Sequence, residues 1–315
     1  MLIALITPSA PRVRNGNRNT AQRWACFLRK QGHRVTIQVE WDGRHADLML
    51  ALHARRSHDS IKRFSELQPH SPLIVVLTGT DLYRDIQTDK NAQESMRLAT
   101  RMVVLQEMGM AELSPPLQAK TRVIYQSATQ IKPTPPLKNS FEVCIIGNLR
   151  EEKDPFRCAL ASALLPEKSG IKILQIGQAL NQQYAEEARE LMRHNQRYLW
   201  LGELPHWQVR RKLARCRLLA ITSRMEGGAN VVCEALAADL PVIASAVSGN
   251  IGMLGQDYAG YYPYGDENSL SKLLYRAESE PEFYGLLKTQ CAARKALIQP
   301  QQESTGLQRL LEEVI

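Results

Sequence analysis

The sequence predicts an α/β protein made of two Rossmann-like domains that face each other across a cleft. Short aliphatic runs alternate with longer amphipathic runs along the 315 residues, which is typical of parallel sheets covered by helices. The alternation stops once, over 128–140, where three prolines interrupt any apolar period. Because ligands bind at the carboxyl ends of parallel strands, two such sheets in series predict a ligand cleft between them.

Each half of the chain has its own set of expected elements. The expected strands are Leu2–Thr7, Arg34–Val39, Asp47–Leu52, Leu73–Leu77, Arg101–Leu105 and Arg122–Tyr125, then Glu142–Ile146, Lys172–Ile176, Leu199–Leu201, Leu218–Thr222 and Val242–Ala244. Helical patterns are expected between the strands of the first half, for example Thr20–Gln31. In the second half they are expected at about 155–164, 182–195, 206–215, 230–238 and 267–277, followed by a last helix at Thr305–Ile315. We therefore expect one domain over 1–130, a second over 141–298, and a C-terminal helix within 299–315 that packs back towards the first domain.

Composition excludes several classes of protein. The chain is 44% hydrophobic and 23% charged, without repeats or low-complexity segments. Its six cysteines are scattered and form no C-x-x-C pair, which indicates a reducing compartment rather than a disulfide framework or a metal cluster. The opening MLIALITPSAP has no basic residues before its apolar run, and no apolar run approaches the ~18 residues of a membrane span. A cytoplasmic protein without stable membrane association is expected.

Positive charge is concentrated in the first half. Residues 1–127 contain 18 Lys and Arg against 11 Asp and Glu, whereas the rest of the chain contains 22 against 21. Such an excess suits nucleic acid, an anionic membrane surface or small phosphorylated ligands. No nucleic-acid-binding motif is present and the basic residues are not interleaved with aromatic ones, so no nucleic-acid partner is expected. A cleft for a small anion is favoured, and a solvated basic surface is the alternative.

The stretch RMEGGANVVCEAL places two carboxylates around a glycine pair. The glycines open a turn and the apolar residues after them predict a helix, so Glu226 lies before the helix and Glu234 about two turns inside it. The N–H groups of residues 228–230, at the start of that helix, suit phosphate or sugar oxygens. A carboxylate accepts two hydrogen bonds at once, so Glu234 fits a ribose diol and Glu226 a hexose hydroxyl. The alternative for each is a surface carboxylate or a helix-capping charge, which is less favoured for Glu234 because apolar residues flank it.

The stretch CIIGNLREEKDPF predicts a turn that binds a diphosphate. A strand ends at Gly147, and Arg150 and Lys153 follow ahead of a helix. Cations beside a helix N-terminus suit a diphosphate because the helix dipole and its free N–H groups add to their charge. Taken alone, this pattern is more often a solvated charged turn.

Together, the two motifs resemble the large retaining class of nucleotide-sugar glycosyltransferases with the GT-B fold. ITSRMEGGANVVCEALAADLPVIAS has the E-x7-E spacing of that class, and CIIGNLREEKDPF is similar to its G-R-L-x-x-x-K turn. The resemblance implies that Lys153 contacts the diphosphate, Glu226 the donor sugar and Glu234 the ribose of a UDP-sugar. The class has an arginine where this chain has Asn148, so Arg150 is expected to supply the second cation. The implied donor-binding residues are Arg150, Lys153, Glu226, Gly227, Gly228, Ala229, Asn230 and Glu234.

The loops of the first half carry many arginines. They are found in PRVRNGNRNTAQRW, ALHARRS and LTGTDLYRDI, which follow predicted strands. Guanidinium groups bind phosphate through two parallel hydrogen bonds, which a neutral polyol does not require. A small, highly charged acceptor is therefore expected, with about half of these arginines placed instead on helix surfaces. The arginines are Arg12, Arg14, Arg18, Arg23, Arg55, Arg56 and Arg84.

The same loops resemble the selenosugar synthases of selenoneine biosynthesis, a branch of the GT-B glycosyltransferases. The similar segments are NGNRNTAQRWA, WDGRHADLMLALHARRS, LTGTDLYRDI, TRVIYQSA and NLREEKDPFR. The resemblance implies that a UDP-sugar, expected to be UDP-N-acetylglucosamine, donates its glycosyl group to the selenium of selenophosphate in the cleft between an acceptor domain and a donor domain. It also implies a functional link to an enzyme that produces selenophosphate. The implied acceptor-binding residues are Gly16, Asn17, Arg18, Arg55, Arg56, Thr80 and Arg84.

Such chemistry needs little acid or base catalysis. The selenium of selenophosphate is a strong, largely deprotonated nucleophile, and the departing UDP needs only stabilisation of its charge. The chain has no D-x-D motif, since Asp81 and Asp85 are four residues apart, so no metal and no cofactor are expected. Later loss of the phosphoryl group requires water, and His53 or Asp81 is the expected catalytic residue beside Glu226. A core histidine and a turn residue are the respective alternatives.

Two other functions share the predicted fold. A conventional GT-B enzyme would transfer a sugar to a lipid or polysaccharide hydroxyl, and a Trp-rich amphipathic stretch would favour it, but Trp24 and Trp41 are isolated. A non-catalytic sensor of sugar nucleotides is the second alternative. The joint presence of Lys153, Glu226 and Glu234 argues against the sensor.

Overall fold

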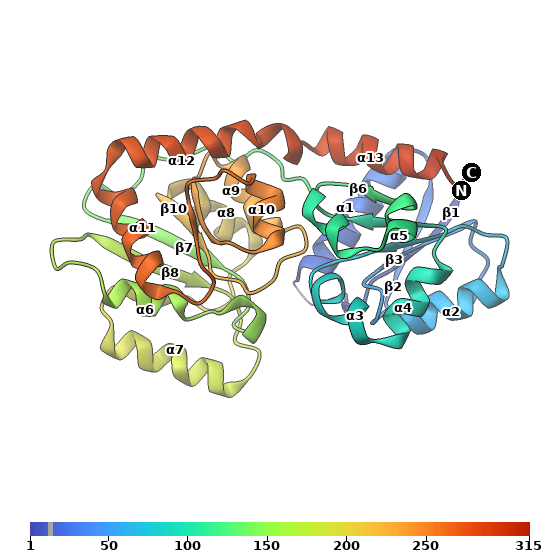
Figure 1. The fold of residues 1–315 in the computed structure, drawn as a ribbon, viewed down its shortest axis with the longest axis horizontal. Coiled ribbons are helices and arrows are strands. Elements are labelled where there is room, and N and C mark those ends of the chain that lie inside the picture. The colour runs from blue at the N-terminus through green and yellow to red at the C-terminus, as the bar shows by residue number, and fades with distance from the viewer. Residues whose placement is uncertain (12–14) are drawn as a thin grey trace. The chain divides into compact units, whose positions relative to one another are not determined.

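The computed structural model describes residues 1–11 and 15–315, which form two compact units. The first unit contains Met1–Ser127, Glu226–Asn230 and Gln299–Ile315, and the second contains Ala128–Met225 and Val231–Ile298. Each unit has one six-stranded sheet whose paired strands are parallel, with helices between the strands (Figure 1). The predicted class of two Rossmann-like α/β domains is therefore confirmed. The predicted cleft between the domains stays a prediction, and Arg12 and Arg14 lie outside the described residues.

The sheet of the first unit has the strand order β2-β1-β3-β4-β5-β6. Its strands are β1 (Leu2–Ile6), β2 (Arg34–Gln38), β3 (Leu48–Leu52), β4 (Leu73–Val76), β5 (Arg101–Val104) and β6 (Thr121–Val123). Its helices are α1 (Gly16–Lys30), α2 (His58–Leu67), α3 (Ile86–Thr88), α4 (Lys90–Leu98), α5 (Pro115–Ala119) and α13 (Pro300–Glu312), with a π-helical turn at Asp81–Asp85 and a 3₁₀ turn at Glu107–Glu112.

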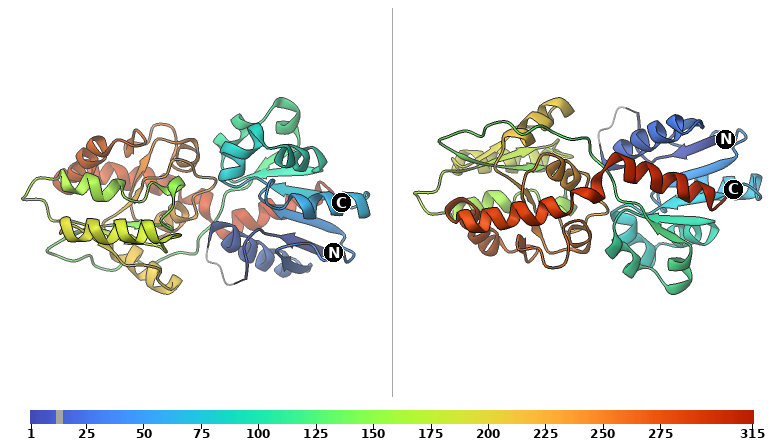
Figure 2. Two further views of the ribbon diagram at one scale, coloured as in Figure 1. Left: turned by 90° about the horizontal axis from the view of Figure 1, so that it is seen from below. Right: turned by 90° about the horizontal axis from the view of Figure 1, so that it is seen from above.

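Helices cover both faces of this sheet, because alternate strand residues point to opposite sides. In β1, Ile3 and Leu5 belong to a core shared with α1 and α13, whereas Ala4 and Ile6 belong to a core shared with α2 and α4. Figure 2 shows α1 on one side of the sheet and the helices that follow β4 on the other. Burial on two faces explains why β1, β3 and β4 appear in the sequence as continuous hydrophobic runs.

The sheet of the second unit has the order β12-β11-β10-β7-β8-β9. Its strands are β7 (Phe141–Ile146), β8 (Ile171–Ile176), β9 (Tyr198–Trp200), β10 (Leu218–Ile221), β11 (Val242–Ser245) and β12 (Tyr261–Tyr262). Its helices are α6 (Arg157–Ala163), α7 (Gln182–His194), α8 (His206–Arg215), α9 (Asn230–Ala237), α10 (Ser248–Leu254), α11 (Glu267–Ser279) and α12 (Pro281–Ala293), with 3₁₀ turns at Glu151–Lys153 and Lys295–Ile298. The first residue of α9 clusters with the first unit.

Helix α1 begins earlier than the expected Thr20. The side chain of Asn15 caps it by accepting a hydrogen bond from the backbone N–H of Arg18 at 3.0 Å. The predicted acceptor residues Gly16, Asn17 and Arg18 therefore lie in the first turn of a helix and not in a loop. The sequence alone does not identify Asn15 as the capping residue, because it lies within one polar stretch.

Among the strands and α-helices of the second unit, β12, α10 and α12 were not predicted. The strand β12 has two residues and α10 has seven, which is too short for a clear period. A single residue, Glu280, separates α11 from α12, so the pattern shows no obvious break. Helix α13 begins at Pro300 instead of Thr305, because proline is well suited to the first position of a helix.

The proline-rich segment 128–140 has no regular helix or strand and is tied to the second unit. The N–H of Ile131 donates to the carbonyl of Ala237 at 2.9 Å, and the N–H of Thr134 donates to that of Ala214 at 2.7 Å.

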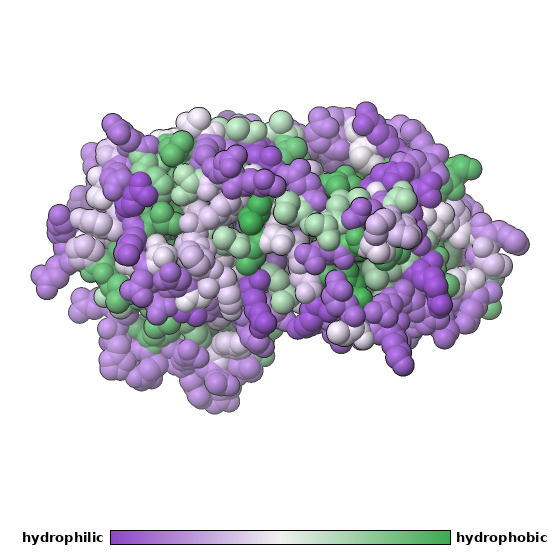
Figure 3. Space-filling view, viewed as in Figure 1, coloured by the Kyte–Doolittle hydropathy of each residue, from purple (hydrophilic) through white to green (hydrophobic). Residues whose placement is uncertain are grey.

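Hydrophilic side chains predominate on the face shown in Figure 3, and its apolar areas are scattered. Among residues 1–11 and 15–315, no helix has both the length and the apolar character required to cross a bilayer.

Candidate functional site

The glycine pair after β10 packs against the carboxyl ends of β4 and β5 in the first unit. A Cβ atom at Gly227 would lie 2.7 Å from the carbonyl carbon of Thr78, and one at Gly228 would lie 2.6 Å from the Cβ of Leu105. Neither position has room for a side chain, so glycine is required at both. The sequence indicated a turn that exposes backbone, and the structure adds this requirement for close packing.

Glu226, at the start of this loop, is only 7% exposed. It is therefore not the solvated surface carboxylate that was the alternative to a sugar-binding role. Burial, together with the carboxylates of Glu112 and Glu226, raises the pKa of Tyr83, whose hydroxyl accepts a hydrogen bond from Nε2 of Gln106 at 2.6 Å. A carboxylate and a neutral phenol thus lie near one another at this edge of the first sheet.

Asn230 ends the loop and begins α9. Its Oδ1 accepts a hydrogen bond from Nη1 of Arg23 at 3.3 Å, and a Cβ at Gly16 would lie 3.5 Å from its Nδ2. The residue before it, Ala229, has a φ of +37°, which L-residues rarely adopt. The structure thus places Asn230, predicted for the donor, beside Gly16, predicted for the acceptor. Arg23 also pairs with Glu303 at 2.7 Å, so this arginine is engaged in the interior.

Glu234 lies in the second turn of α9, and its Oε1 accepts a hydrogen bond from Nε2 of His206 at 2.9 Å. The carboxylate side chain is 19% exposed and the imidazole 64%. His206 is the first residue of α8, a helix whose bounds were predicted correctly, but no feature of the sequence connected this histidine to Glu234. Their proximity is a product of tertiary packing.

Lys153 lies across the end of β7. Its Cγ, Cδ and Cε atoms are 3.6–3.8 Å from where a Cβ at Gly147 would stand, so the lysine stem covers the glycine. The carbonyl of Lys153 accepts a hydrogen bond from the Thr222 hydroxyl at 2.8 Å, and the carbonyl of Glu152 accepts one from the N–H of Arg224 at 2.9 Å. The predicted diphosphate turn is thereby fixed to the segment that follows β10.

Arg150 and Asn148 complete this turn. The Nε of Arg150 lies 3.8 Å from a carboxylate oxygen of Glu152, and the arginine side chain is 38% exposed. The Oδ1 of Asn148 accepts a hydrogen bond from the N–H of Gln178 at 3.2 Å, which joins the loops after β7 and β8. The departure from the family motif at Asn148 thus has a structural use in this chain.

His53 is a buried residue with an unusual backbone. Its φ is +74° and its side chain is 1% exposed. The N–H of Arg56 donates to its Nδ1 at 3.3 Å, so Nε2 carries the proton and donates to the Thr80 hydroxyl at 3.0 Å. Burial lowers the pKa of His53, with the carboxylate of Asp81 acting in the opposite direction, and the ring is neutral at pH 7.

Asp81 is fully buried and joins two loops. Its Oδ1 accepts hydrogen bonds from the backbone N–H and the hydroxyl of Thr78, and its Oδ2 accepts one from the N–H of Ala54. These contacts hold the loop after β3 against the loop after β4. These hydrogen bonds indicate that Asp81 positions the two loops. A catalytic role for Asp81 or for His53 stays a prediction.

Arg55 and Arg84 converge on one buried carboxylate. The Nε of Arg55 lies 2.8 Å from Oδ2 of Asp85, and the Nε of Arg84 lies 3.1 Å from its Oδ1. Arg56, whose side chain is exposed, precedes α2 close by in the sequence. The π-helical turn Asp81–Asp85 carries both Arg84 and Asp85, and π-helical turns are frequent at functional sites. The structure therefore brings Arg55, Arg84 and their shared Asp85 together, whereas Asn17 and Arg18 follow β1.

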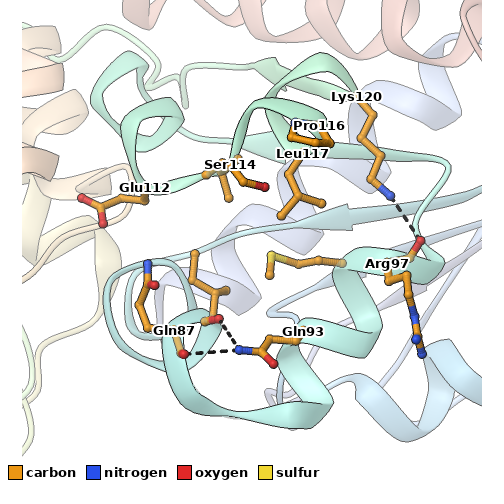
Figure 4. Close-up of a pocket in the computed structure, with 11 residues that line it drawn as sticks. Gln87, Gln93, Arg97, Glu112, Ser114, Pro116, Leu117 and Lys120 are labelled. Carbon is orange, nitrogen blue, oxygen red and sulfur yellow. Dashed lines mark hydrogen bonds between the residues drawn. The ribbon is translucent and has the colours of Figure 1, made fainter.

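A separate pocket of about 570 Å³ lies in the first unit between α3, α4 and α5. Met96 is among the residues that line it. Figure 4 shows Leu117 facing it, with Gln93 bonded to backbone oxygens and Lys120 donating to a carbonyl at the end of α4. Its lining includes none of the residues predicted for donor or acceptor.

Within residues 1–11 and 15–315, no group of three or more His, Cys, Asp or Glu is arranged to hold a metal ion. Metal independence stays a prediction.

Solved structures with the same fold are known. HepE of Anabaena, in complex with UDP and glucose, matches with a TM-score of 0.77 and 15% identity over 100% of this chain and 99% of that one. The sucrose-phosphate synthase of Thermosynechococcus elongatus matches with a TM-score of 0.79 and 15% identity over 99% and 98%. The lipopolysaccharide outer core galactosyltransferase WaaB, in its apo form, matches with a TM-score of 0.72 and 13% identity over 100% of both chains. The GT-B architecture expected from the sequence is thereby confirmed.

The sequence itself matches a family model. The model described as "Glycosyl transferases group 1" matches residues 126–292, which is more than half of the chain and includes the predicted diphosphate turn and both glutamates of the E-x7-E pair. This chain therefore belongs to the group 1 family of glycosyl transferases.

Proposed function

We propose that this protein transfers a glycosyl group from a UDP-sugar, with UDP-N-acetylglucosamine as the expected donor, to the selenium of selenophosphate. Membership of the group 1 family supports the reaction class. The similar HepE protein is bound to UDP in one structure and to UDP-glucose in another, which supports a uridine nucleotide as the donor. The acceptor is proposed from the arginine pair and from the resemblance of the loops around it.

On the donor side, Lys153 and Arg150 would bind the diphosphate and Glu234 the ribose. The main chain of the diphosphate turn is held by the hydroxyl of Thr222 and the N–H of Arg224, so the lysine starts from a fixed backbone. A preorganised cation stabilises the charge that develops on the departing UDP without reorganisation during the reaction. Glu226, in its buried setting, would accept hydrogen bonds from the donor sugar.

On the acceptor side, the observation that carries the proposal is the convergence of Arg55 and Arg84 on Asp85. Two guanidinium groups against one carboxylate leave a net positive charge. The arginine side chains are 38% and 47% exposed, so both reach solvent, and each guanidinium has five N–H donors. A neutral polyol needs no such charge, whereas selenophosphate is a small anion with several oxygens that Arg recognises well.

The chemistry follows from these groups. A lone pair on selenium forms the C1–Se bond while the C1–O bond to the diphosphate breaks, and its electron pair leaves with UDP. Because the selenium is already deprotonated, this step requires no general base. In a later step, water attacks phosphorus and the P–Se bond breaks with its electron pair on selenium, so that phosphate leaves; His53 or Asp81 is the residue proposed to assist this step. We propose that the transfer needs no metal, since Lys153, Arg150 and the N-terminus of α9 supply positive potential for the diphosphate.

The test is UDP release from UDP-N-acetylglucosamine by the purified full chain, with selenophosphate, thiophosphate, phosphate, a lipid or polysaccharide hydroxyl acceptor, or no acceptor, with and without EDTA. Mass spectrometry would follow the sugar product. UDP release that depends on selenophosphate, with a selenium-bearing hexosamine as product, is the expected result. Release only with hydroxyl acceptors would assign the conventional transferase instead. Tight UDP binding without turnover on any acceptor would assign the sensor. Either result would overturn the proposed acceptor.

A further inference from the structure

The ring of His206 donates a hydrogen bond to the carboxylate of Glu234, and this contact joins two helices. Nε2 lies 2.9 Å from Oε1, and the two residues are 28 positions apart in the chain. A carboxylate is an acceptor only, so Nε2 must carry the hydrogen, whether the ring is neutral or charged. The position of one carboxylate oxygen of Glu234 is thereby set by a residue that the donor motif does not include.

We propose that His206 is a positioning residue that holds Glu234 in the orientation needed to bind the ribose diol of the nucleotide. This inference rests on the proposed function, in which Glu234 accepts hydrogen bonds from the ribose hydroxyls. A glutamate has three flexible torsions, so a carboxylate that must meet two hydroxyls loses side-chain entropy on binding. Restraint of one oxygen before the ligand arrives reduces that loss.

The surroundings of the pair support this role. The Glu234 side chain is mostly covered, at 19% exposed, yet still reaches solvent, while that of His206 is 64% exposed. His206 follows Pro205, whose ring restricts φ at the start of α8. His206 is the first residue of α8, and helical backbone limits the rotamers open to its side chain.

A second histidine–carboxylate pair in the same unit shows what an ordinary surface contact looks like. His194 and Glu190 lie one turn apart on α7, with Nε2 2.7 Å from Oε1, and their side chains are 74% and 52% exposed. That pair connects residues of a single helix and is remote from the predicted donor motif in sequence. Because its chemistry is the same, His194→Ala is a matched control for His206→Ala.

The experiment compares the affinity of the full chain for UDP and for 2′-deoxyuridine 5′-diphosphate, which lacks one ribose hydroxyl. The variants are His206→Ala, His206→Gln, Glu234→Gln and His194→Ala, measured by calorimetry after their thermal unfolding has been compared. We expect the wild type to prefer UDP and Glu234→Gln to lose that preference. His206→Ala is expected to weaken UDP binding by roughly tenfold, a factor typical of a hydrogen bond to a charged group, and to weaken binding of the deoxy ligand, which keeps only one hydroxyl for Glu234, by less.

Two further readouts separate positioning from folding. The amide of His206→Gln can still donate to Glu234, so this variant is expected to recover most of the preference, and His194→Ala is expected to match the wild type. In turnover, His206→Ala is expected to raise KM for the UDP-sugar with kcat within about twofold, because uniform binding is lost.

The outcomes distinguish this inference from the function on which it rests. A normal preference for UDP in His206→Ala, together with its loss in Glu234→Gln, would overturn the role of His206 alone. A wild type that binds both ligands equally would overturn the ribose role of Glu234 and the inference with it, while UDP-sugar turnover would stand. Failure to bind UDP at all would overturn the proposed function. If His206→Ala unfolds, the result of His206→Gln decides: its failure to retain the preference would also overturn the inference.

Discussion

Arg23 in α1 and Glu303 in α13 are joined by two hydrogen bonds in the interior of the first unit. Nε of the arginine donates to Oε2 at 2.7 Å and Nη2 donates to Oε1 at 3.0 Å, and Glu303 is 1% exposed. The same carboxylate accepts from the indole N–H of Trp24 at 2.6 Å and from the backbone N–H of Ser127 at 2.9 Å. A residue near the C-terminus thus satisfies donors on α1 and on the segment after β6.

Replacement of this carboxylate is expected to destabilise the protein. In Glu303→Gln the amide nitrogen cannot accept the hydrogen bonds of Arg23 and Trp24, and the guanidinium loses its counter-charge. We expect a loss of about 3 kcal/mol in the free energy of unfolding, as for other broken buried ion pairs, measured by urea denaturation. Glu312→Gln, an exposed glutamate of the same helix, should be neutral. Equal stability of the two variants would contradict a structural role for Glu303.

The glycine loop should not tolerate a single added methyl group. In Gly227→Ala the new Cβ would meet the backbone of Thr78 at 2.7 Å. We expect a loss of about 2 kcal/mol in stability and a fall of about 100-fold in kcat/KM, since Glu226 would be displaced. Gly285→Ala is the control, because no atom lies within 4 Å of its added Cβ; in the middle of α12 it should stabilise by about 1 kcal/mol. Wild-type activity in Gly227→Ala would refute the close packing.

The arginine pair should determine affinity for the anionic acceptor. In Arg55→Met and in Arg84→Met we expect KM for selenophosphate to rise by at least about tenfold, with the affinity for UDP unchanged, because charge-assisted hydrogen bonds to phosphate oxygens are lost. The wild-type KM should also rise with salt concentration. Arg44→Met, which removes an arginine that is 89% exposed and paired with Asp42, serves as the control. A similar rise in KM in that variant would point to bulk charge and not to a site.

His53 should make stability depend on pH in the acid range. Burial holds its pKa below the usual 6.5, so the unfolded chain binds a proton more readily than the folded one. Its contribution to stability is therefore complete above about pH 6.5 and is lost as pH falls from there through the folded pKa. His53→Asn, a residue that tolerates the φ of +74°, should show a smaller fall in unfolding temperature between pH 7 and pH 5. An unchanged profile in His53→Asn would contradict the assignment of this pH dependence to His53.

Local pattern was sufficient to predict most of the fold. Runs such as Leu48–Leu52 and Leu73–Val76 are apolar because both faces of a parallel strand are buried, and this property is visible in the residues themselves. Helix α8 was placed correctly because its apolar residues Val209 and Leu213 recur at helical spacing. Short or adjoining elements such as β12 and α12 lacked such a signal.

The candidate site was only partly visible in the sequence, and the missing part has one physical cause. The sequence by itself determined the two α/β domains, the E-x7-E pair and the group 1 signature, because each of these features depends on residues that are close together in the chain. Only the tertiary structure decided that Glu226 is buried, that the glycine pair packs against Thr78 and Leu105, and that His206 donates a hydrogen bond to Glu234. These contacts join residues far apart in the chain, and their energies arise from shape and hydrogen-bond geometry that exist only after the chain has folded.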